Sequence, residues 1–146
     1  MREDNEKLTL IDYEYGGWNV FAFDIANYLN EYMLDNNWSA GNGIRCYVRN
    51  YATAEEREHL CKLMLERYFT TQLRGDNFDT YWEAKREQIL KEVEACLILN
   101  NFYWGVWALM MLADDDIEKD DVFNYDFAQC RVDMAKKNEE MIQEKN

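Results

Sequence analysis

The sequence predicts a mainly α-helical protein that folds as a single domain, residues 1–146, with a short N-terminal strand and about five helices. Three observations lead to this prediction. Proline, which interrupts helices, is absent from the whole sequence. Apolar residues recur at helical spacings of three and four along most of the chain. Hydrophobic residues make up 48% of the sequence, enough for a chain of this length to bury a core.

The strand is predicted at "KLTLID", residues 7–12, a short run of β-compatible residues that ends at an acid and is soon followed by two glycines. A single strand cannot satisfy its own backbone hydrogen bonds. It must therefore pair in an unforeseen hairpin or in a sheet that other polypeptide supplies. The first helix is predicted from about Ala22 to Leu34, and Gly41 and Gly43 then interrupt the chain.

The second helix has a recognisable start in "ATAEEREHLCKLMLERYFTTQL", because Thr53 precedes Glu56 by three residues, as in a capping box. Its predicted apolar face consists of Leu60, Leu63, Met64 and Tyr68. A long helical pattern covers residues 79–112, and one break near its middle would divide it into two helices. The acidic run "ADDDIEKDD" separates this pattern from a final amphipathic helix at residues 123–146.

The formal net charge of -13 argues against nucleic acid as a partner, because such a surface repels phosphates. The same charge would attract metal ions and organic cations, although acidic surfaces commonly serve solubility alone. The four cysteines form no CxxC pair, which argues against a zinc site or a disulfide framework and favours a reducing compartment. The polar start "MREDNEK" resembles no targeting peptide, so we expect a cytoplasmic protein.

One apolar stretch, Ala95 to Ala113, is long enough to be considered as a membrane span. It contains Asn100, Asn101 and Gly105, and three aspartates follow it directly. These polar residues fit a buried core helix better than a transmembrane helix. We therefore expect no membrane span.

Asp12 and Glu14 are the candidate metal ligands. They are two residues apart, so in extended backbone both carboxylates point to the same side. Two hard oxygen donors placed in this way suit Mg²⁺, which proteins hold through one or two carboxylates together with nucleotide phosphates. The alternative is a pair of solvated acids at the end of a strand.

Trp104 and Trp107 are three residues apart and project from one face of the predicted helix, with Gly105 between them leaving that surface open. Paired indoles at this spacing can form two walls of a box for a quaternary ammonium group. Ordinary core tryptophans would show the same spacing. Further aromatic and acidic candidates for such a box are Glu31, Tyr32, Tyr125 and Phe127.

Groups for acid–base catalysis and phosphate binding are not recognisable in the sequence. His59 has no serine, cysteine or second histidine in a triad arrangement, so we interpret it as a structural histidine at or near the surface. The glycine-rich phosphate loops GxxxxGK[ST] and GxGxxG are missing as well. Nucleotide binding would therefore need polypeptide beyond these 146 residues.

The stretch "IDYEYGGWNVFAFDIANYLNEY", residues 11–32, closely resembles the choline/ethanolamine kinase signature, roughly IDFEYxxYNxxxFDIxNHFxEW. The segments "YATAEEREHLCKLMLERYF", "ILKEVEACLILNNFYWGVWALM" and "YDFAQCRVDM" resemble later parts of that family in the same order. The resemblance implies a protein-kinase-like fold, of which this chain would form the later part of the C-terminal lobe. The partners of the orphan strand would then lie in the region expected before Met1.

The resemblance also implies roles for individual residues. Asp12 would take the place of the metal-binding aspartate of protein kinases, holding Mg²⁺ against the phosphates of ATP, with Glu14 as a second candidate ligand. The residues that match the family's ammonium site are Tyr15, Glu31, Trp104, Trp107 and Phe127. Phe127 replaces a usual tyrosine, so that its ring is kept and its hydroxyl is lost. Tyr28 and Tyr32 also depart from the family pattern, which has histidine and tryptophan there.

The family's catalytic loop, HxDxxxxN, and its nucleotide-binding lobe have no counterpart in these residues. We therefore expect no catalytic residue within this chain, a catalytic base upstream of Met1, and little or no activity of the chain alone. The implied function is ATP-dependent phosphorylation of choline or ethanolamine in phospholipid biosynthesis. The alternatives are a non-catalytic choline-binding module, a pseudoenzyme that docks onto an intact kinase, or a helical interaction protein. Exposure of the face that meets the missing part would favour self-association as a homodimer.

Overall fold

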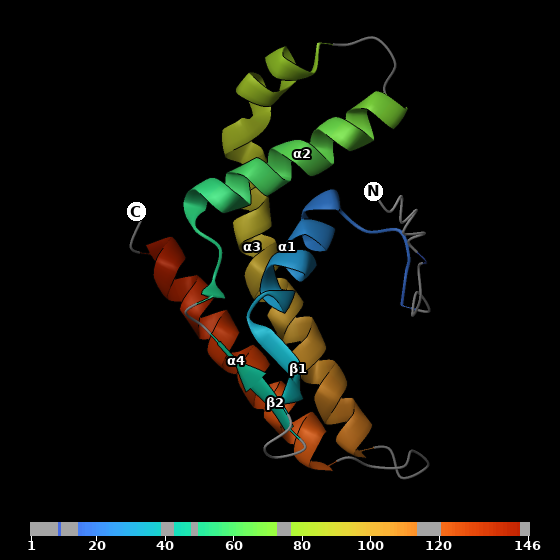
Figure 1. Ribbon diagram of the computed structural model, residues 1–146, viewed down its shortest axis with the longest axis vertical. Coiled ribbons are helices and arrows are strands. Elements are labelled where there is room, and N and C mark those ends of the chain that lie inside the picture. Colours follow the sequence, from blue (N-terminus) through green and yellow to red (C-terminus); the bar gives the residue numbers. More distant parts are fainter. Residues whose placement is uncertain are drawn as a thin grey trace, which may run out of the picture.

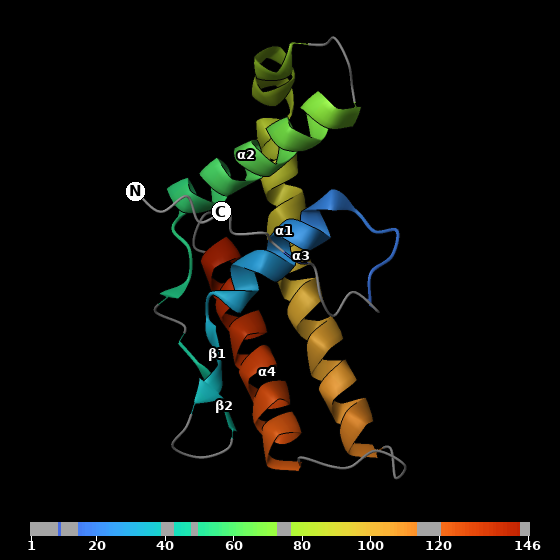
Figure 2. The same cartoon turned by 45° about the vertical axis from the view of Figure 1, so that its right-hand side comes forward.

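The computed structural model describes Thr9 and residues 15–38, 43–47, 50–72, 77–113 and 121–143. The elements in chain order are α1 (Phe21–Glu31), β1 (Leu34–Trp38), β2 (Gly43–Cys46), α2 (Ala54–Gln72), α3 (Phe78–Ala113) and α4 (Asp121–Gln143). Helices α3 and α4 run antiparallel and side by side (Figure 1). Helices α1 and α2 pack against α3, and the β1–β2 hairpin lies along α4 (Figure 2).

The mainly α-helical prediction is confirmed, with one correction to the number of helices. The described part of the chain contains four helices rather than five, because α3 continues over 36 residues without the predicted break. The helix begins where Asn77 accepts a hydrogen bond from the backbone N–H of Asp79 over 3.1 Å. The strand predicted at residues 7–12 lies, apart from Thr9, outside the described residues.

Helix α1 ends earlier than predicted. The backbone N–H of Met33 donates to the carbonyl oxygen of Asn30 over 3.1 Å, and the chain then turns into a strand at Leu34. Strands β1 and β2 form an antiparallel pair in which Leu34 faces Cys46. This hairpin is not predicted by the sequence, because the polar residues of β1 do not alternate with apolar ones as in a half-buried strand.

The predicted start of the second helix is confirmed. The backbone N–H of Thr53 donates to the Glu56 carboxylate over 2.8 Å, and the N–H of Glu56 donates to the Thr53 hydroxyl over 3.2 Å. Two otherwise unpaired donors are thereby satisfied. The hydrogen bond from the backbone N–H of Thr53 is the main cause that lowers the pKa of Glu56, because it stabilises the ionised carboxylate.

The buried face of α2 differs from the predicted one. The side chains that point into the core are Arg57, Cys61, Leu65 and Phe69. This row repeats every fourth residue, and its last three members each follow one of the predicted residues directly. Of the predicted residues, Leu60 and Met64 are partly buried and pack against the same core. Leu63 and Tyr68, which were expected in the core, are about half exposed. Arg57 was not expected on this face because its side chain is charged, and its burial is compensated by a hydrogen bond from its guanidinium to the carbonyl oxygen of Ala52 over 2.6 Å.

Two apolar clusters hold the elements together. The first joins α1, α2 and α3 around Ile25, Leu29, Cys61, Leu65, Trp82 and Leu97. The second joins β2, α3 and α4 around Ile44, Ala108, Phe127 and Ala128. Leu34, Trp104, Trp107 and Cys130 pack against this second cluster. The hairpin and the two tryptophans are therefore part of one packed unit with α4.

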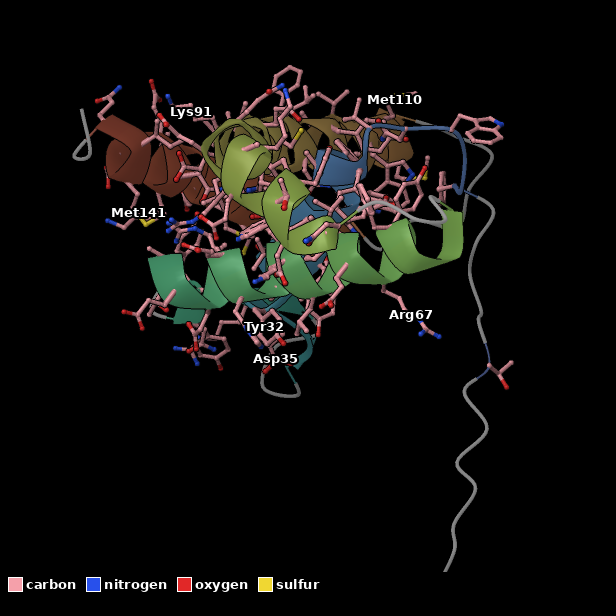
Figure 3. The ribbon with its side chains drawn as sticks, turned by 90° about the horizontal axis from the view of Figure 1, so that it is seen from above. Tyr32, Asp35, Arg67, Lys91, Met110 and Met141 are labelled. Atoms are coloured by element: carbon pink, nitrogen blue, oxygen red, sulfur yellow. The ribbon has the colours of Figure 1, made fainter. Side chains whose placement is uncertain are left out.

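Helix α3 has one buried face and one exposed apolar face. By length and composition it is the one helix among the described residues that could cross a membrane, and 33% of its most apolar stretch is buried. The exposed apolar side chains are Leu99, Phe102, Tyr103, Val106, Leu109 and Met110. Figure 3 shows Met110 on the side of the molecule away from α2. The expectation of a buried core helix therefore holds for one face of α3 only.

Candidate functional site

The structure brings together four aromatic side chains that the sequence proposes for the ammonium site. The ring centroid of Tyr15 lies 5.8 Å from that of Trp104 and 6.2 Å from that of Trp107. The two indoles are 5.7 Å apart, and Phe127 lies 6.2 Å from Trp107. Neighbouring ring planes meet at 75–86°. Such edge-to-face pairs are a favourable aromatic arrangement.

The aromatic cluster runs from the surface into the core. Tyr15 is 55% exposed, the two tryptophans are half-buried, and Phe127 is 7% exposed. The indole N–H of Trp107 donates to the hydroxyl oxygen of Tyr15 over 3.1 Å, which joins the segment before α1 to α3. The surface end of the cluster is therefore exposed to solvent, whereas Phe127 supports it from the core.

Trp104 is fixed by an amide from α1. Its indole N–H donates to the Oδ1 atom of Asn27 over 2.8 Å, and the side-chain N–H of Asn100 donates to the same oxygen over 2.9 Å. Half-buried tryptophans commonly pair their N–H group in this way. Asn27 therefore fixes the position of one ring of the cluster without being aromatic itself.

The amide pairing continues below the rings. The side-chain N–H of Asn30 donates to Asn100 Oδ1 over 2.9 Å and to the carbonyl oxygen of Leu97 over 3.2 Å. Asn138 of α4 donates to Asn30 Oδ1 over 3.4 Å. Asn30, Asn100 and Asn138 are fully buried. Hydrogen bonds are stronger in such a low-dielectric interior, so this amide network ties α1, α3 and α4 together.

Glu31 is held by a buried arginine. Arg131 of α4 donates to the Glu31 carboxylate over 2.5 Å and to Asn101 Oδ1 over 3.2 Å. Its guanidinium also lies over the ring of Phe127, 4.7 Å from the centroid. Burial lowers the pKa of Arg131, and the Glu31 carboxylate opposes that shift. Glu31 is thus connected to the aromatic cluster through Arg131, while 41% of its side chain remains exposed.

Gly105 lies where α3 packs against α4. It is buried, and a Cβ atom added to it would lie 3.5 Å from Arg131 Cβ and 3.9 Å from the carbonyl oxygen of Ala128. Helix α4 therefore packs against this glycine, which also lines a cavity of about 270 Å³ with Val106 and Arg131.

Tyr28 and Tyr32, the two departures from the family pattern, face α2. Their hydroxyl groups are 3.1 Å apart, and this hydrogen bond raises the pKa of Tyr32. Both line a cavity of about 260 Å³ with His59 and Glu56. His59 itself is exposed, as the sequence analysis expected.

The metal-binding prediction is not tested by the structure. Asp12 and Glu14 lie outside the described residues. Within the part of the chain that is described, no three His, Cys, Asp or Glu side chains gather where they could hold a metal ion. Magnesium binding therefore stays a prediction.

Most of the polar residues around the rings are not predicted by the sequence. The amides of Asn30, Asn100 and Asn138, and Arg131, were given no role at the site. The available signal was the presence of Asn100 and Asn101 in an otherwise apolar run, since buried polar side chains require partners. The identity of those partners depends on how the helices pack.

Known proteins that are similar to this chain are named as choline or ethanolamine kinases. A family model described as choline/ethanolamine kinase matches residues 1–136. The chain is 31% identical to a protein named "Probable ethanolamine kinase" from Arabidopsis thaliana over 81% of this chain and 27% of the relative. It is 28% identical to human "Choline/ethanolamine kinase" over 88% of this chain and 31% of the relative. It is also 28% identical to mouse "Choline kinase alpha" over 89% of this chain and 28% of the relative. The chain thus spans less than a third of the length of these relatives.

Proposed function

The chain belongs to the choline/ethanolamine kinase family, and from this premise we propose that it forms the ammonium-binding part of an ATP-dependent choline kinase. It would be the later portion of the C-terminal lobe of a protein-kinase-like fold. The product would be phosphocholine, a precursor in phospholipid biosynthesis, with ethanolamine as the alternative substrate.

The observation that carries this proposal is the meeting of Tyr15, Trp104 and Trp107 at near right angles. A cation is attracted to an aromatic face when it lies within about 6 Å of the ring centroid. Rings that meet at right angles allow one cation to lie near more than one face. A trimethylammonium group has no N–H to donate, so it gains most from such faces, and this favours choline over ethanolamine.

Glu31 would supply the countercharge. Its carboxylate is bonded to Arg131 but remains 41% exposed, so it keeps surface that an ammonium group could approach. Arg131 holds that carboxylate in place from the buried side, and its own positive charge is largely neutralised by the pair. Phe127 supports Trp107 and is covered on one side by Arg131.

Magnesium and ATP would be bound mainly outside the described residues. We propose Asp12 as a metal ligand, with Glu14 as the second candidate. When bound, Mg²⁺ neutralises charge on the phosphates of ATP during transfer. The residues of this chain would bind and orient the amino alcohol, and a base from other polypeptide would take the proton of its hydroxyl group.

Tryptophan fluorescence titration tests the proposed site. We expect choline and tetramethylammonium to change the emission of the chain, and ethanolamine to bind more weakly. Trp104→Ala and Trp107→Ala should each weaken choline binding by about five- to thirty-fold, which corresponds to about 1–2 kcal/mol for a lost cation–π contact. Trp18→Ala is the matched control, because Trp18 is fully exposed and should leave the affinity unchanged.

Enzymatic activity needs a second experiment. The 5′ end of the native transcript is mapped, and the product of the complete reading frame is assayed for phosphocholine formed from choline and ATP. If choline binds but the complete product forms no phosphocholine, the chain is a binding module rather than part of an enzyme. Equal choline binding by the Trp104, Trp107 and Trp18 variants would rule out the aromatic site.

A further inference from the structure

Cys46 and Cys130 lie in contact although they are far apart in the sequence. Cys46 ends β2 and Cys130 lies in the middle of α4, and the hairpin runs along that helix (Figures 1 and 2). Both thiols are free and half-buried, and they form a hydrogen bond with each other. Neither cysteine has a role in the proposed kinase site.

The surrounding structure holds the two thiols in this position. Cys46 faces Leu34 across the hairpin, and Leu34 and Cys130 both pack against the apolar cluster that contains Ile44 and Phe127. One thiol is therefore carried by a strand and the other by a helix that packs directly on it. Two cysteines in contact on packed elements need little backbone movement to approach the separation of a disulfide.

The two thiols differ in the charges and the burial around them. The hydrogen bond from Cys130 lowers the pKa of Cys46, and the positive charge of Arg131 acts in the same direction. The same bond, together with burial, raises the pKa of Cys130. The thiolate is the reactive form of cysteine. Cys46 is thus suited to attack first and Cys130 to follow.

We propose that Cys46 and Cys130 form a redox-sensitive dithiol that reacts with low-molecular-weight disulfides such as oxidised glutathione. The Cys46 thiolate attacks one sulfur of oxidised glutathione, forming a mixed disulfide and releasing one glutathione thiolate. Cys130 then loses its proton and attacks the Cys46 sulfur, which forms the Cys46–Cys130 bond and releases the second glutathione. The dithiol loses two electrons and two protons, and one oxidised glutathione becomes two reduced glutathiones.

The other two cysteines provide an internal comparison. Cys61 is fully buried, and burial raises its pKa to about 11. Cys96 is also buried, and burial raises its pKa. Both should react slowly with a polar oxidant, because they lack thiolate character and access. Oxidation of the folded chain should therefore be confined to one pair of cysteines.

The test is oxidation of the folded chain with glutathione disulfide, followed by alkylation of the remaining thiols and non-reducing peptide mapping. We expect two thiols to be lost together, a mass decrease of about 2 Da, and a crosslink that joins the peptides of Cys46 and Cys130 within one molecule. A chain that keeps all of its thiols free, or that crosslinks only between molecules, would overturn the proposal. This measurement uses the unaltered protein and does not depend on choline binding.

Two variants test the order of the steps. Cys130→Ser should accumulate a stable glutathione adduct on Cys46, because the second thiol is missing. Cys46→Ser should accumulate an adduct on Cys130 at least several-fold more slowly, since Cys130 has less thiolate character. Equal rates for the two variants would contradict the assignment of Cys46 as the attacking thiol.

Discussion

Asn27 of α1 accepts a hydrogen bond from the indole N–H of Trp104 over 2.8 Å, although the two residues lie on different helices. The same oxygen also accepts from Asn100. An indole held in this way has less freedom to turn about its side-chain bonds. The orientation of one proposed binding surface therefore depends on an amide that need not contact the ligand.

Replacing Asn27 should weaken both the fold and the binding of choline. Asn27→Leu leaves the donors of Trp104 and Asn100 unpaired, and each unpaired buried donor costs about 1–3 kcal/mol. Urea unfolding measures the loss of stability, and fluorescence titration measures the loss of affinity. Asn27→Asp keeps an acceptor oxygen and should recover choline affinity. If the leucine and aspartate variants bind choline equally well, Asn27 does not position the ring.

The Arg131–Glu31 pair should contribute more to stability than a surface pair of similar length. The Arg131 side chain is 2% exposed, and its guanidinium lies 2.5 Å from the Glu31 carboxylate. In the surface pair, the Arg86 side chain is 47% exposed, and its guanidinium lies 2.6 Å from the Glu58 carboxylate. Glu31→Gln leaves a buried charge without its partner, and we expect a loss of about 1–3 kcal/mol because Glu31 itself is partly exposed. Glu58→Gln, the matched control, should cost less than about 1 kcal/mol. Equal losses in urea unfolding would contradict this difference.

Glu56 should make the stability of the chain depend on pH at acidic values. Its pKa is lowered from an ordinary value near 4.5, because the backbone N–H of Thr53 stabilises the carboxylate. That contribution is present above the ordinary pKa and is lost as the pH falls through the lowered one. The glutamine in Glu56→Gln does not titrate. The stability advantage of the unaltered chain over this variant, measured by urea unfolding, should therefore shrink between pH 7 and about pH 3. If the difference in unfolding free energy between the two chains does not change with pH, the charge of Glu56 does not contribute to the cap.

Gly105→Ala should stabilise the chain and leave ligand binding unchanged. The added Cβ would lie 3.5 Å from Arg131 Cβ, an ordinary contact distance. Alanine favours a helix interior over glycine by up to about 1 kcal/mol, so we expect a gain of about 0.5–1 kcal/mol in urea unfolding. Weaker choline binding in this variant would mean that the glycine leaves room for the ligand after all.

Local interactions were the ones that the sequence predicted best. The capping box at Thr53 and Glu56 depends on residues three apart, so it could be identified from the sequence and is confirmed. The core face of α2 was only partly identified: Leu60 and Met64 pack against the core, whereas the burial of Arg57 was not foreseen, because its packing depends on neighbours such as Tyr51. Local sequence therefore located the helix but not the centre of its buried side.

Long-range pairing could not be derived from local sequence. Spacing placed Trp104 and Trp107 on one helix face, and the resemblance to the kinase family proposed Tyr15 and Phe127 as their neighbours. The partners of Asn100 and Arg131 come from other helices, and no pattern within one segment specifies them. The polar strand β1 pairs because packing on α4 outweighs its weak strand preference.

The buried asparagines also limit how α1, α3 and α4 can be aligned. Moving one helix along another by a single turn would preserve many apolar contacts but would leave the amides of Asn30, Asn100 and Asn138 without acceptors. Three leucines at these positions would remove that penalty, so several alignments of similar energy would compete. The amides would then contribute less to the stability of the helices than to the uniqueness of the helix arrangement. Replacing them would most easily cost the chain its sharp NMR spectrum.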